Sequence, residues 1–167
     1  MVEDAAHGLG GNYIGGEKIG SCIYSDCTVF SLHPVKSIAA GEGGVITTNS
    51  QEIYKKLLRL RSHGINKLDD EFENKELAYT DNNKNLWYYE MTSLGYHYRI
   101  TDIQASLANS QLDKLDNFIK KRRAVSHKYV KSLANIPFIE PAQKINIDNS
   151  ANHIFPVLID FKKLKLS

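Results

Sequence analysis

The sequence has little cysteine, no long apolar run and no excess of charge of one sign. Two cysteines, Cys22 and Cys27, are too few for a disulfide framework or a four-ligand zinc site, so we expect a reducing, cytoplasmic setting. No apolar run approaches the roughly 20 residues that span a bilayer, and the N-terminus lacks the pattern of a signal peptide. With 21 basic and 19 acidic residues, the net charge is only +2. We therefore expect neither a membrane nor nucleic acid as a partner.

The histidines do not have the spacing of metal ligands. The histidines at positions 33, 63, 127 and 153 show neither an HExxH motif nor another paired ligand spacing, so they are interpreted as packing or surface residues. No metal is predicted. The composition, with 42% hydrophobic and 10% aromatic residues in 167, is sufficient for a folded core.

The first part of the chain predicts short strands joined by loops. Residues 1–7 are typical of the end of a strand that runs into a glycine-rich loop at residues 8–20. Residues 29–32 and 44–48 have the β-branched and aromatic character of strands, and a helix capped by Asn49 or Ser50 follows them. This order of strands and helix indicates an α/β fold.

The second part predicts a loop, a helix and a last strand. Residues 64–89 are polar and without period, which favours a long loop, and its Trp87–Tyr89 cluster is expected to anchor that loop rather than border a sugar site. Thr101 and Gln104 form a capping-box pattern that begins a long helix, with a kink expected near Asp116. Residues 155–160 predict another strand.

Lys36 and Asp4 are the residues whose surroundings suggest chemistry. Lys36 lies in an apolar turn before a glycine-rich segment at residues 41–44, where backbone can pass close to a flat ring. A nucleophilic lysine needs such partial burial, although a structural lysine fits the same turn. Asp4 follows a predicted strand, where α/β proteins bind ligands, and a turn cap is the alternative interpretation.

Taken together, these segments resemble the DegT/DnrJ/StrS family of nucleotide-sugar aminotransferases, which depend on pyridoxal 5'-phosphate (PLP). The likeness covers almost the whole chain in order and spacing. The segments that carry it are Glu3–His7, Gly20–Cys22, Ser25–Asp26, Thr28–Lys36, Gly41–Gly44, Leu60–Ile65, Trp87–Glu90, Leu94–Gln104 and Gln111–Asp116.

The resemblance implies a role for each matching residue. Lys36 would form the Schiff base with the cofactor and act as the catalytic acid and base, and Asp4 would pair with the pyridine nitrogen. His7 would lie beside the 3-hydroxyl of the ring, and Ser31 would bind the phosphate. His97 stands where the family usually has an asparagine that reaches the phosphate in the neighbouring subunit, and a histidine can also donate a hydrogen bond. Related sugar dehydratases carry histidine at the lysine position, so Lys36 favours amino transfer.

The resemblance also implies a fold, a substrate and an organisation. It implies part of a fold-type I PLP-dependent transferase, an aspartate aminotransferase-like large domain with a mainly parallel sheet, and the start of a small C-terminal domain. Residues 1–116 would belong to the large domain, and residues 117–167 to the linking helix and the small domain. Family members continue in both directions beyond this match, so we expect an internal piece of such an enzyme.

The segments at residues 61–65 and 87–90 resemble family members of pseudaminic acid biosynthesis most. These transfer an amino group from glutamate to C4 of a UDP-4-keto-6-deoxy-N-acetylhexosamine, and work as homodimers. Three alternatives stay open: another keto-sugar nucleotide, an inactive remnant, and a dinucleotide-binding module that uses the glycines at residues 8–16.

Overall fold

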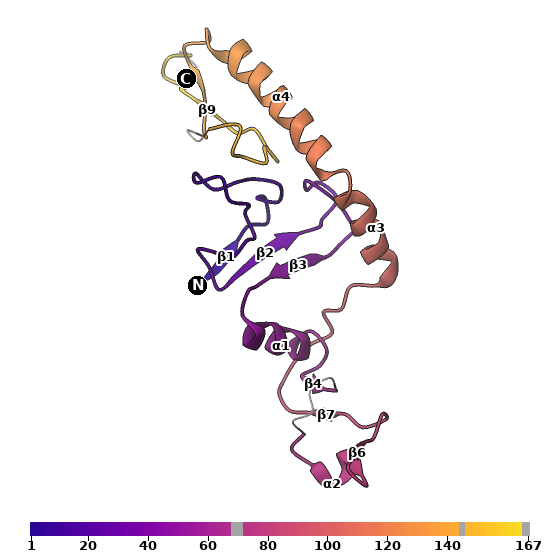
Figure 1. Cartoon of the computed structure of the whole chain (residues 1–167). Helices are drawn as coiled ribbons and strands as arrows, with labels where there is room; N and C mark the ends of the chain where they lie inside the picture. The colour runs from indigo at the N-terminus through magenta and orange to yellow at the C-terminus, as the bar shows by residue number, and fades with distance from the viewer. Residues whose placement is uncertain (68–71, 144–145, 165–167) are drawn as a thin grey trace. The chain divides into compact units, whose positions relative to one another are not determined.

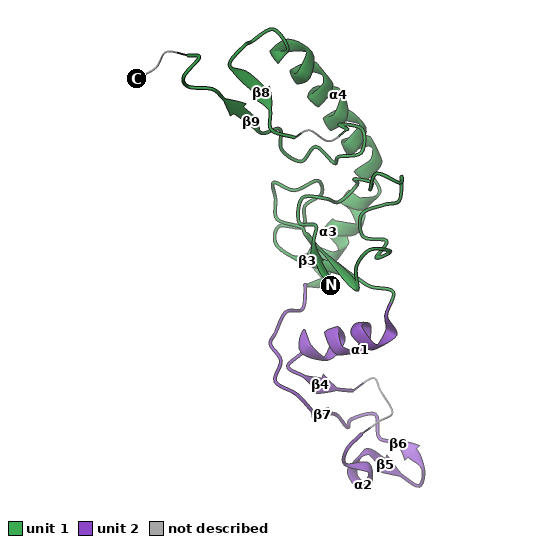
Figure 2. Cartoon of the chain, turned by 90° about the vertical axis from the view of Figure 1, so that its left-hand side faces the viewer, with its two compact units in different colours: residues 1–49, 101–167 green, residues 50–100 purple. Residues whose placement is uncertain are grey.

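The computed structural model describes residues 1–67, 72–143 and 146–164. The chain divides into two compact units, which Figure 2 colours separately: unit 1 comprises residues 1–49 and 101–167, and unit 2 comprises residues 50–100. The described elements of unit 1 are β1 (Val2–Asp4), β2 (Cys27–Ser31), β3 (Gly44–Thr47), α3 (Asp102–Leu112), α4 (Leu115–Leu133), β8 (Ile139–Pro141) and β9 (Val157–Ile159). Those of unit 2 are α1 (Gln51–Leu60), β4 (Ile65–Asn66), α2 (Lys75–Ala78), β5 (Tyr79–Thr80), β6 (Asn83–Lys84) and β7 (Glu90–Met91).

The sheet of unit 1 has the strand order β1-β2-β3 (Figure 1). β1 and β2 are parallel, with Asp4 opposite Val29, whereas β2 and β3 are antiparallel, with Val29 opposite Ile46. The central strand β2 is the most buried, since Thr28 is 0% and Phe30 4% exposed. The strand end predicted at residues 1–7 and the two strands predicted from β-branched and aromatic residues are therefore confirmed, and the sheet is mixed.

The long helix expected after Thr101 is two helices. Thr101 caps α3 as predicted, because its Oγ1 accepts from the Gln104 backbone N–H and the Gln104 side chain accepts from the Thr101 N–H. The chain then turns at Asp113 and Lys114, ahead of the kink expected near Asp116. The Lys114 N–H donates to the Gln111 carbonyl three residues back, which interrupts the α-helical hydrogen-bond ladder.

The end of unit 1 contains a strand pair of which only one strand was expected. β9 matches the strand predicted at residues 155–160, while β8 lies in a stretch for which no strand was predicted. The two strands are antiparallel, with Glu140 opposite Leu158. β8 was missed because three residues that include a proline carry too little pattern to indicate a strand.

Unit 2 begins with α1, whose N-terminus is capped by the Ser50 side chain as one of the two predicted options. The expectation of an irregular loop at residues 64–89 is wrong in part, because β4, α2, β5 and β6 fall within it. A small core of Phe72, Ala78 and Tyr88 holds these short elements together. Trp87 and its neighbour Tyr89 are 67% and 58% exposed, so only Tyr88 of the aromatic cluster anchors the segment.

Cys22 and Cys27 are both free and buried. Among the helices that the structure describes, none combines the length and apolar character needed to cross a membrane.

Candidate active site

Two neighbouring parallel strands deliver the predicted site residues to one edge of the sheet. Asp4 is the last residue of β1, and Ser31 is the last residue of β2. Because the strands are parallel, their carboxyl ends lie at the same edge, where α/β proteins bind ligands. His7 follows β1 and Lys36 follows β2, so four predicted residues come from this edge of unit 1.

The turn that carries Lys36 is fixed to the core. The Lys36 N–H donates to the His33 carbonyl at 2.9 Å, and the base of the loop is closed by Ala40 N–H to Leu32 carbonyl, also 2.9 Å. Ser37 and Ile38, the next two residues, are 6% and 4% exposed, whereas Lys36 is half-buried. The amine therefore extends from a turn that its neighbours hold in place.

Lys36 lines a cavity of about 420 Å³. Its walls come from the Lys36 turn and from the α3–α4 region, with the lining residues Pro34, Lys36, Ser37, Ile38, Ala39, Gln111, Phe118, Lys121 and Arg122. The volume lies within the usual range for small-molecule sites. Lys121 and Arg122, which also line the cavity, add positive charge to its wall and so suit an anionic ligand.

His153 lies near two of the predicted residues. Its ring centroid is 4.5 Å from that of His7, and burial, His7, Lys36 and Arg122 together lower the pKa of His153. Arg122 also donates through Nη1 to the His153 carbonyl at 3.1 Å, which ties this loop to α4. In the structure, the His153 ring therefore contacts that of His7, and the charge of Lys36 acts on His153.

The interpretation of His153 as a packing or surface residue missed this placement. Its Nδ1 is buried and has no hydrogen-bond partner among the described residues. No local signal identifies it, since the residues that approach it are far away in the sequence.

Within the described part of the chain, the side chains of Asp4 and Ser31 make only local hydrogen bonds. Asp4 Oδ1 accepts from the Ala6 N–H at 3.1 Å, so the turn-cap interpretation of this residue is correct, yet the exposed carboxylate remains at the sheet edge. Ser31 Oγ accepts from the His33 N–H at 3.4 Å. Neither of these bonds prevents a second interaction.

His97 belongs to unit 2, whereas the other predicted site residues belong to unit 1. It forms an antiparallel bridge with Ser62, and its ring centroid lies 5.5 Å from that of His63. The side chain is exposed. Its role at a cofactor stays a prediction.

A network that the sequence did not indicate fixes the glycine-rich loop to the sheet. Glu3 Oε2 accepts from the Tyr13 hydroxyl at 2.6 Å and from Thr28 Oγ1 at 2.8 Å. Burial and the Glu3 carboxylate raise the pKa of Tyr13 to about 12. Because Glu3 precedes Asp4, this network stabilises the strand end that presents the candidate carboxylate.

The glycine-rich loop lacks the geometry of a dinucleotide-binding turn. It follows β1 but folds back on itself through an antiparallel bridge between Asn12 and Lys18. The next element in the chain is β2, not a helix. The dinucleotide-binding alternative therefore lacks the strand-to-helix context that it requires.

Known proteins with similar sequences include transaminases of a UDP-amino sugar. The chain is 35% identical over 159 residues to the UDP-4-amino-4,6-dideoxy-N-acetyl-beta-L-altrosamine transaminase of Campylobacter jejuni, covering 95% of this chain and 37% of that protein. It is 38% identical over 168 residues to an uncharacterized protein, MJ1066, of Methanocaldococcus jannaschii, covering 100% of this chain and 40% of the relative. The chain thus spans about two fifths of the length of these curated relatives.

Solved structures give the same result for the fold. The aminotransferase PseC of Helicobacter pylori, involved in the biosynthesis of pseudoaminic acid, matches with a TM-score of 0.79 and 30% identity, over 96% of this chain and 38% of that one. The sugar aminotransferase Spr1654 of Streptococcus pneumoniae in its PLP form matches with a TM-score of 0.75 and 28% identity, over 95% and 37% of the two chains. The expected partial fold-type I architecture is confirmed.

The match to the family extends along the sequence as far as the structural match does. The profile of the DegT/DnrJ/EryC1/StrS aminotransferase family covers residues 1–166, and the aminotransferases of this family are PLP-dependent. The chain belongs to the DegT/DnrJ/EryC1/StrS aminotransferase family.

Proposed function

We propose that this chain forms the part of a PLP-dependent active site that contains the Schiff-base lysine, Lys36. The reaction is transfer of an amino group from glutamate to C4 of a UDP-4-keto-6-deoxy-N-acetylhexosamine, in the cytoplasm. The observation that supports it most is the position of Asp4, Ser31 and Lys36 after the carboxyl ends of two adjacent parallel strands. Two relatives support the class of reaction by their names, one as a UDP-4-amino-4,6-dideoxy-N-acetyl-beta-L-altrosamine transaminase and the other as an aminotransferase involved in the biosynthesis of pseudoaminic acid.

The side chains at this edge fit the chemical groups of PLP. Lys36 supplies an amine for the aldehyde carbon, Asp4 a carboxylate for the pyridine nitrogen, and Ser31 a hydroxyl for the phosphate. The Lys36 turn is anchored on buried residues, so the amine is held at a defined place. His7 would lie at the 3-hydroxyl, with its ring beside that of His153, whose own pKa is lowered by burial and by nearby positive charges.

Each residue has a definite task in this proposal. When bound, PLP acts as an electron sink that lets a proton leave the substrate carbon. Lys36 would hold the cofactor covalently and, once displaced by the substrate amine, its Nζ would accept and return that proton. Asp4 would keep the pyridine nitrogen protonated through its negative charge.

The remaining parts of the proposal concern the assembly. His97 would reach the cofactor phosphate of a second subunit in a homodimer, in the place of the asparagine that the family usually has there. Residues 1–116 would complete the cofactor-binding domain, and residues 117–167 would begin the small domain. These assignments rest on the family resemblance.

A spectral titration tests the cofactor part. Addition of PLP to the intact protein is expected to give a visible absorbance band that differs from that of free PLP, because the Lys36 amine condenses with the aldehyde. Lys36→Ala is expected to abolish the band, while Lys131→Ala, an exposed lysine in the last turn of α4, leaves it unchanged. A wild-type spectrum equal to the sum of protein and free PLP would contradict the proposal.

The donor and acceptor are tested in separate half-reactions. Glutamate added to the PLP-loaded protein is expected to shift the band and release about one equivalent of 2-oxoglutarate per site, the stoichiometry of an amino transfer that has no acceptor. Addition of the UDP-keto-sugar should then restore the first spectrum and give the 4-amino sugar by mass spectrometry. Restoration by a different keto-sugar nucleotide, but not by this one, would correct the substrate and keep the chemistry.

A further inference from the structure

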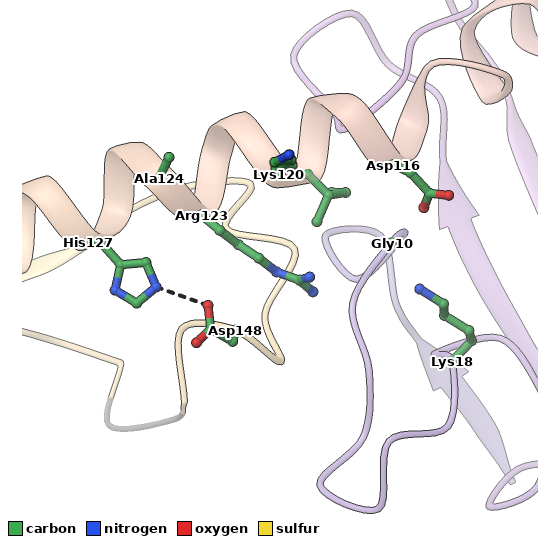
Figure 3. A pocket seen from close by; sticks show the side chains of 9 residues that line it. Gly10, Lys18, Asp116, Lys120, Arg123, Ala124, His127 and Asp148 are labelled. Atoms are coloured by element: carbon green, nitrogen blue, oxygen red, sulfur yellow. Dashed lines mark hydrogen bonds and ion pairs between the residues drawn. The ribbon is translucent and has the colours of Figure 1, made fainter.

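A second cavity in unit 1, of about 400 Å³, lies between α4 and two loops, as Figure 3 shows from close by. One loop is the glycine-rich segment with Gly10 and Lys18, and the other contains Asp148. The lining residues are Gly10, Lys18, Asp116, Ile119, Lys120, Arg123, Ala124, His127 and Asp148.

This cavity is separate from the cavity at Lys36. With 3.6 residues per turn, the α4 residues that line it, centred on Arg123, lie on the opposite face of the helix from Phe118, Lys121 and Arg122, which line the Lys36 cavity. None of the predicted site residues is among those that line it. Whatever binds here therefore approaches α4 from the side away from the candidate active site.

Arg123 is the cavity residue whose hydrogen bonding indicates a bound ligand. Its Nε donates to the Ser150 carbonyl at 3.2 Å, which fixes the direction of the side chain. Its Nη2 is buried and has no hydrogen-bond partner among the described residues. Burial removes water from this nitrogen, and no hydrogen bond within the described residues offsets that cost. We therefore expect a ligand atom that accepts a hydrogen bond from it.

The other charges of the cavity favour an anion as that acceptor. The lining includes three permanent cations, Lys18, Lys120 and Arg123, against two carboxylates. One of the carboxylates, Asp148, is engaged by His127, with Oδ1 2.9 Å from Nε2. Figure 3 shows the Arg123 guanidinium and the Lys18 amine both directed into the hollow.

The loop with Lys18 is held against the helix by close packing. Gly10 has a φ of +88°, and a Cβ at this position would lie 2.6 Å from Cγ1 of the buried Ile119. Only glycine allows this approach. The loop that carries Lys18 is therefore held against α4, and Lys18 and Arg123 line the same cavity.

We propose that Arg123 and Lys18 bind a phosphate group at this cavity. A guanidinium matches the geometry of phosphate oxygens through paired N–H donors, and the ammonium adds a second charge. The phosphate is either free or carried by a nucleotide, since the volume exceeds what one phosphate fills. The proposal is independent of the role of Lys36, because it concerns another face of α4.

Calorimetric titration of the intact protein tests the site with inorganic phosphate, UMP and uridine. Wild-type protein is expected to bind phosphate and UMP but not uridine. Arg123→Gln should weaken both by roughly tenfold or more, the effect of losing a charge-assisted pair of hydrogen bonds. Lys131→Gln removes the same charge from the end of α4 and is expected to leave both affinities unchanged. Tighter binding of UMP than of phosphate identifies a nucleotide as the source, and the reverse identifies free phosphate.

Two further variants keep the test decisive. Lys18→Gln should also weaken phosphate binding, and it decides the matter if Arg123→Gln disturbs folding by releasing the Ser150 loop. Ser31→Ala should leave the phosphate affinity of this cavity intact, which separates it from the proposed cofactor site. The proposal is overturned if wild-type protein gives no heat with millimolar phosphate, if the Lys18 and Arg123 variants bind like wild type, or if Lys131→Gln causes an equal loss.

Discussion

At the scale of single residues, the candidate site combines a lysine that the sequence identified with a histidine that it did not. Lys36 stood out through its apolar turn and the motifs on either side. His153 stood in a polar stretch without pattern, and only the folded chain places it beside His7 and within the field of Lys36. A histidine whose pKa is lowered by burial and by neighbouring charges, and whose ring contacts a predicted site residue, is a physical indication of a functional site.

The effect of the Lys36 charge on the pKa of His153 can be measured directly. Burial and the nearby charges of His7, Lys36 and Arg122 lower the pKa of His153. Removing one of these positive charges with Lys36→Met is therefore expected to raise that pKa, as followed by NMR titration of the imidazole without added PLP. Lys131→Met serves as the control for loss of a lysine. An unchanged pKa in Lys36→Met would show that the amine does not act on His153.

The same shift predicts a pH dependence of stability. The pKa of His153 in the folded chain lies below its ordinary value of 6.5, so below that pH the unfolded chain binds more protons at this residue. The free energy of unfolding is expected to increase as the pH rises through this window to about 6.5. His153→Gln should reduce the slope in urea denaturation measured across the window, and an identical slope in both proteins would contradict the assignment.

At the scale of elements, capping side chains link the helices to the site. Gln104 completes the capping box of α3 and also donates through Nε2 to the Glu42 carbonyl at 3.0 Å. Glu42 lies in the glycine-rich segment that follows the Lys36 turn. The start of α3 therefore helps to hold the segment that the sequence predicted to pass close to a flat ring.

Loss of the cap at Thr101 should be measurable as a decrease in the free energy of unfolding. Thr101→Ala removes the side-chain acceptor for the Gln104 N–H and is expected to lower the free energy of unfolding by about 1 kcal/mol. Thr101→Ser keeps the hydroxyl and should lose much less. Urea denaturation followed by circular dichroism gives both values, and equal midpoints for Thr101→Ala and wild type would show that the cap contributes nothing.

At the scale of the whole molecule, stability is expected to concentrate in the centre of the unit 1 sheet. In β2 the side chains of Thr28 and Phe30 are 0% and 4% exposed, whereas Leu158 and Ile159 in β9 are 50% and 42% exposed. Both strands have hydrogen-bonded partners, so the difference lies in the burial of apolar surface.

Hydrogen exchange can measure this difference. The amides of β2 should exchange more slowly than those of β9, because opening β2 exposes more buried surface than opening β9 does. Mass spectrometry of peptides from the two strands of the intact protein provides the comparison. Equal protection of both strands would mean that local burial does not set the order of stability.

The sequence by itself determined the local elements and the family. The positions of β1, β2, β3 and β9, the caps at Ser50 and Thr101, and the order of motifs around Lys36 depend on neighbouring residues, so they could be predicted. The short elements of residues 64–89 and the break at Lys114 could not, because two-residue strands and one altered turn leave no period in the sequence.

Only the tertiary structure decided which distant side chains meet. Glu3 with Tyr13 and Thr28, His7 with His153, and Arg123 with the Ser150 carbonyl are pairs brought together by folding. Their contacts depend on how β1, β2, α4 and the loops pack. That packing is driven by the burial of apolar surface throughout unit 1, and because this force is non-directional, no local sequence pattern reveals which residues it brings together. Local pattern therefore identified the lysine, and long-range packing supplied the charged surroundings in which it would act.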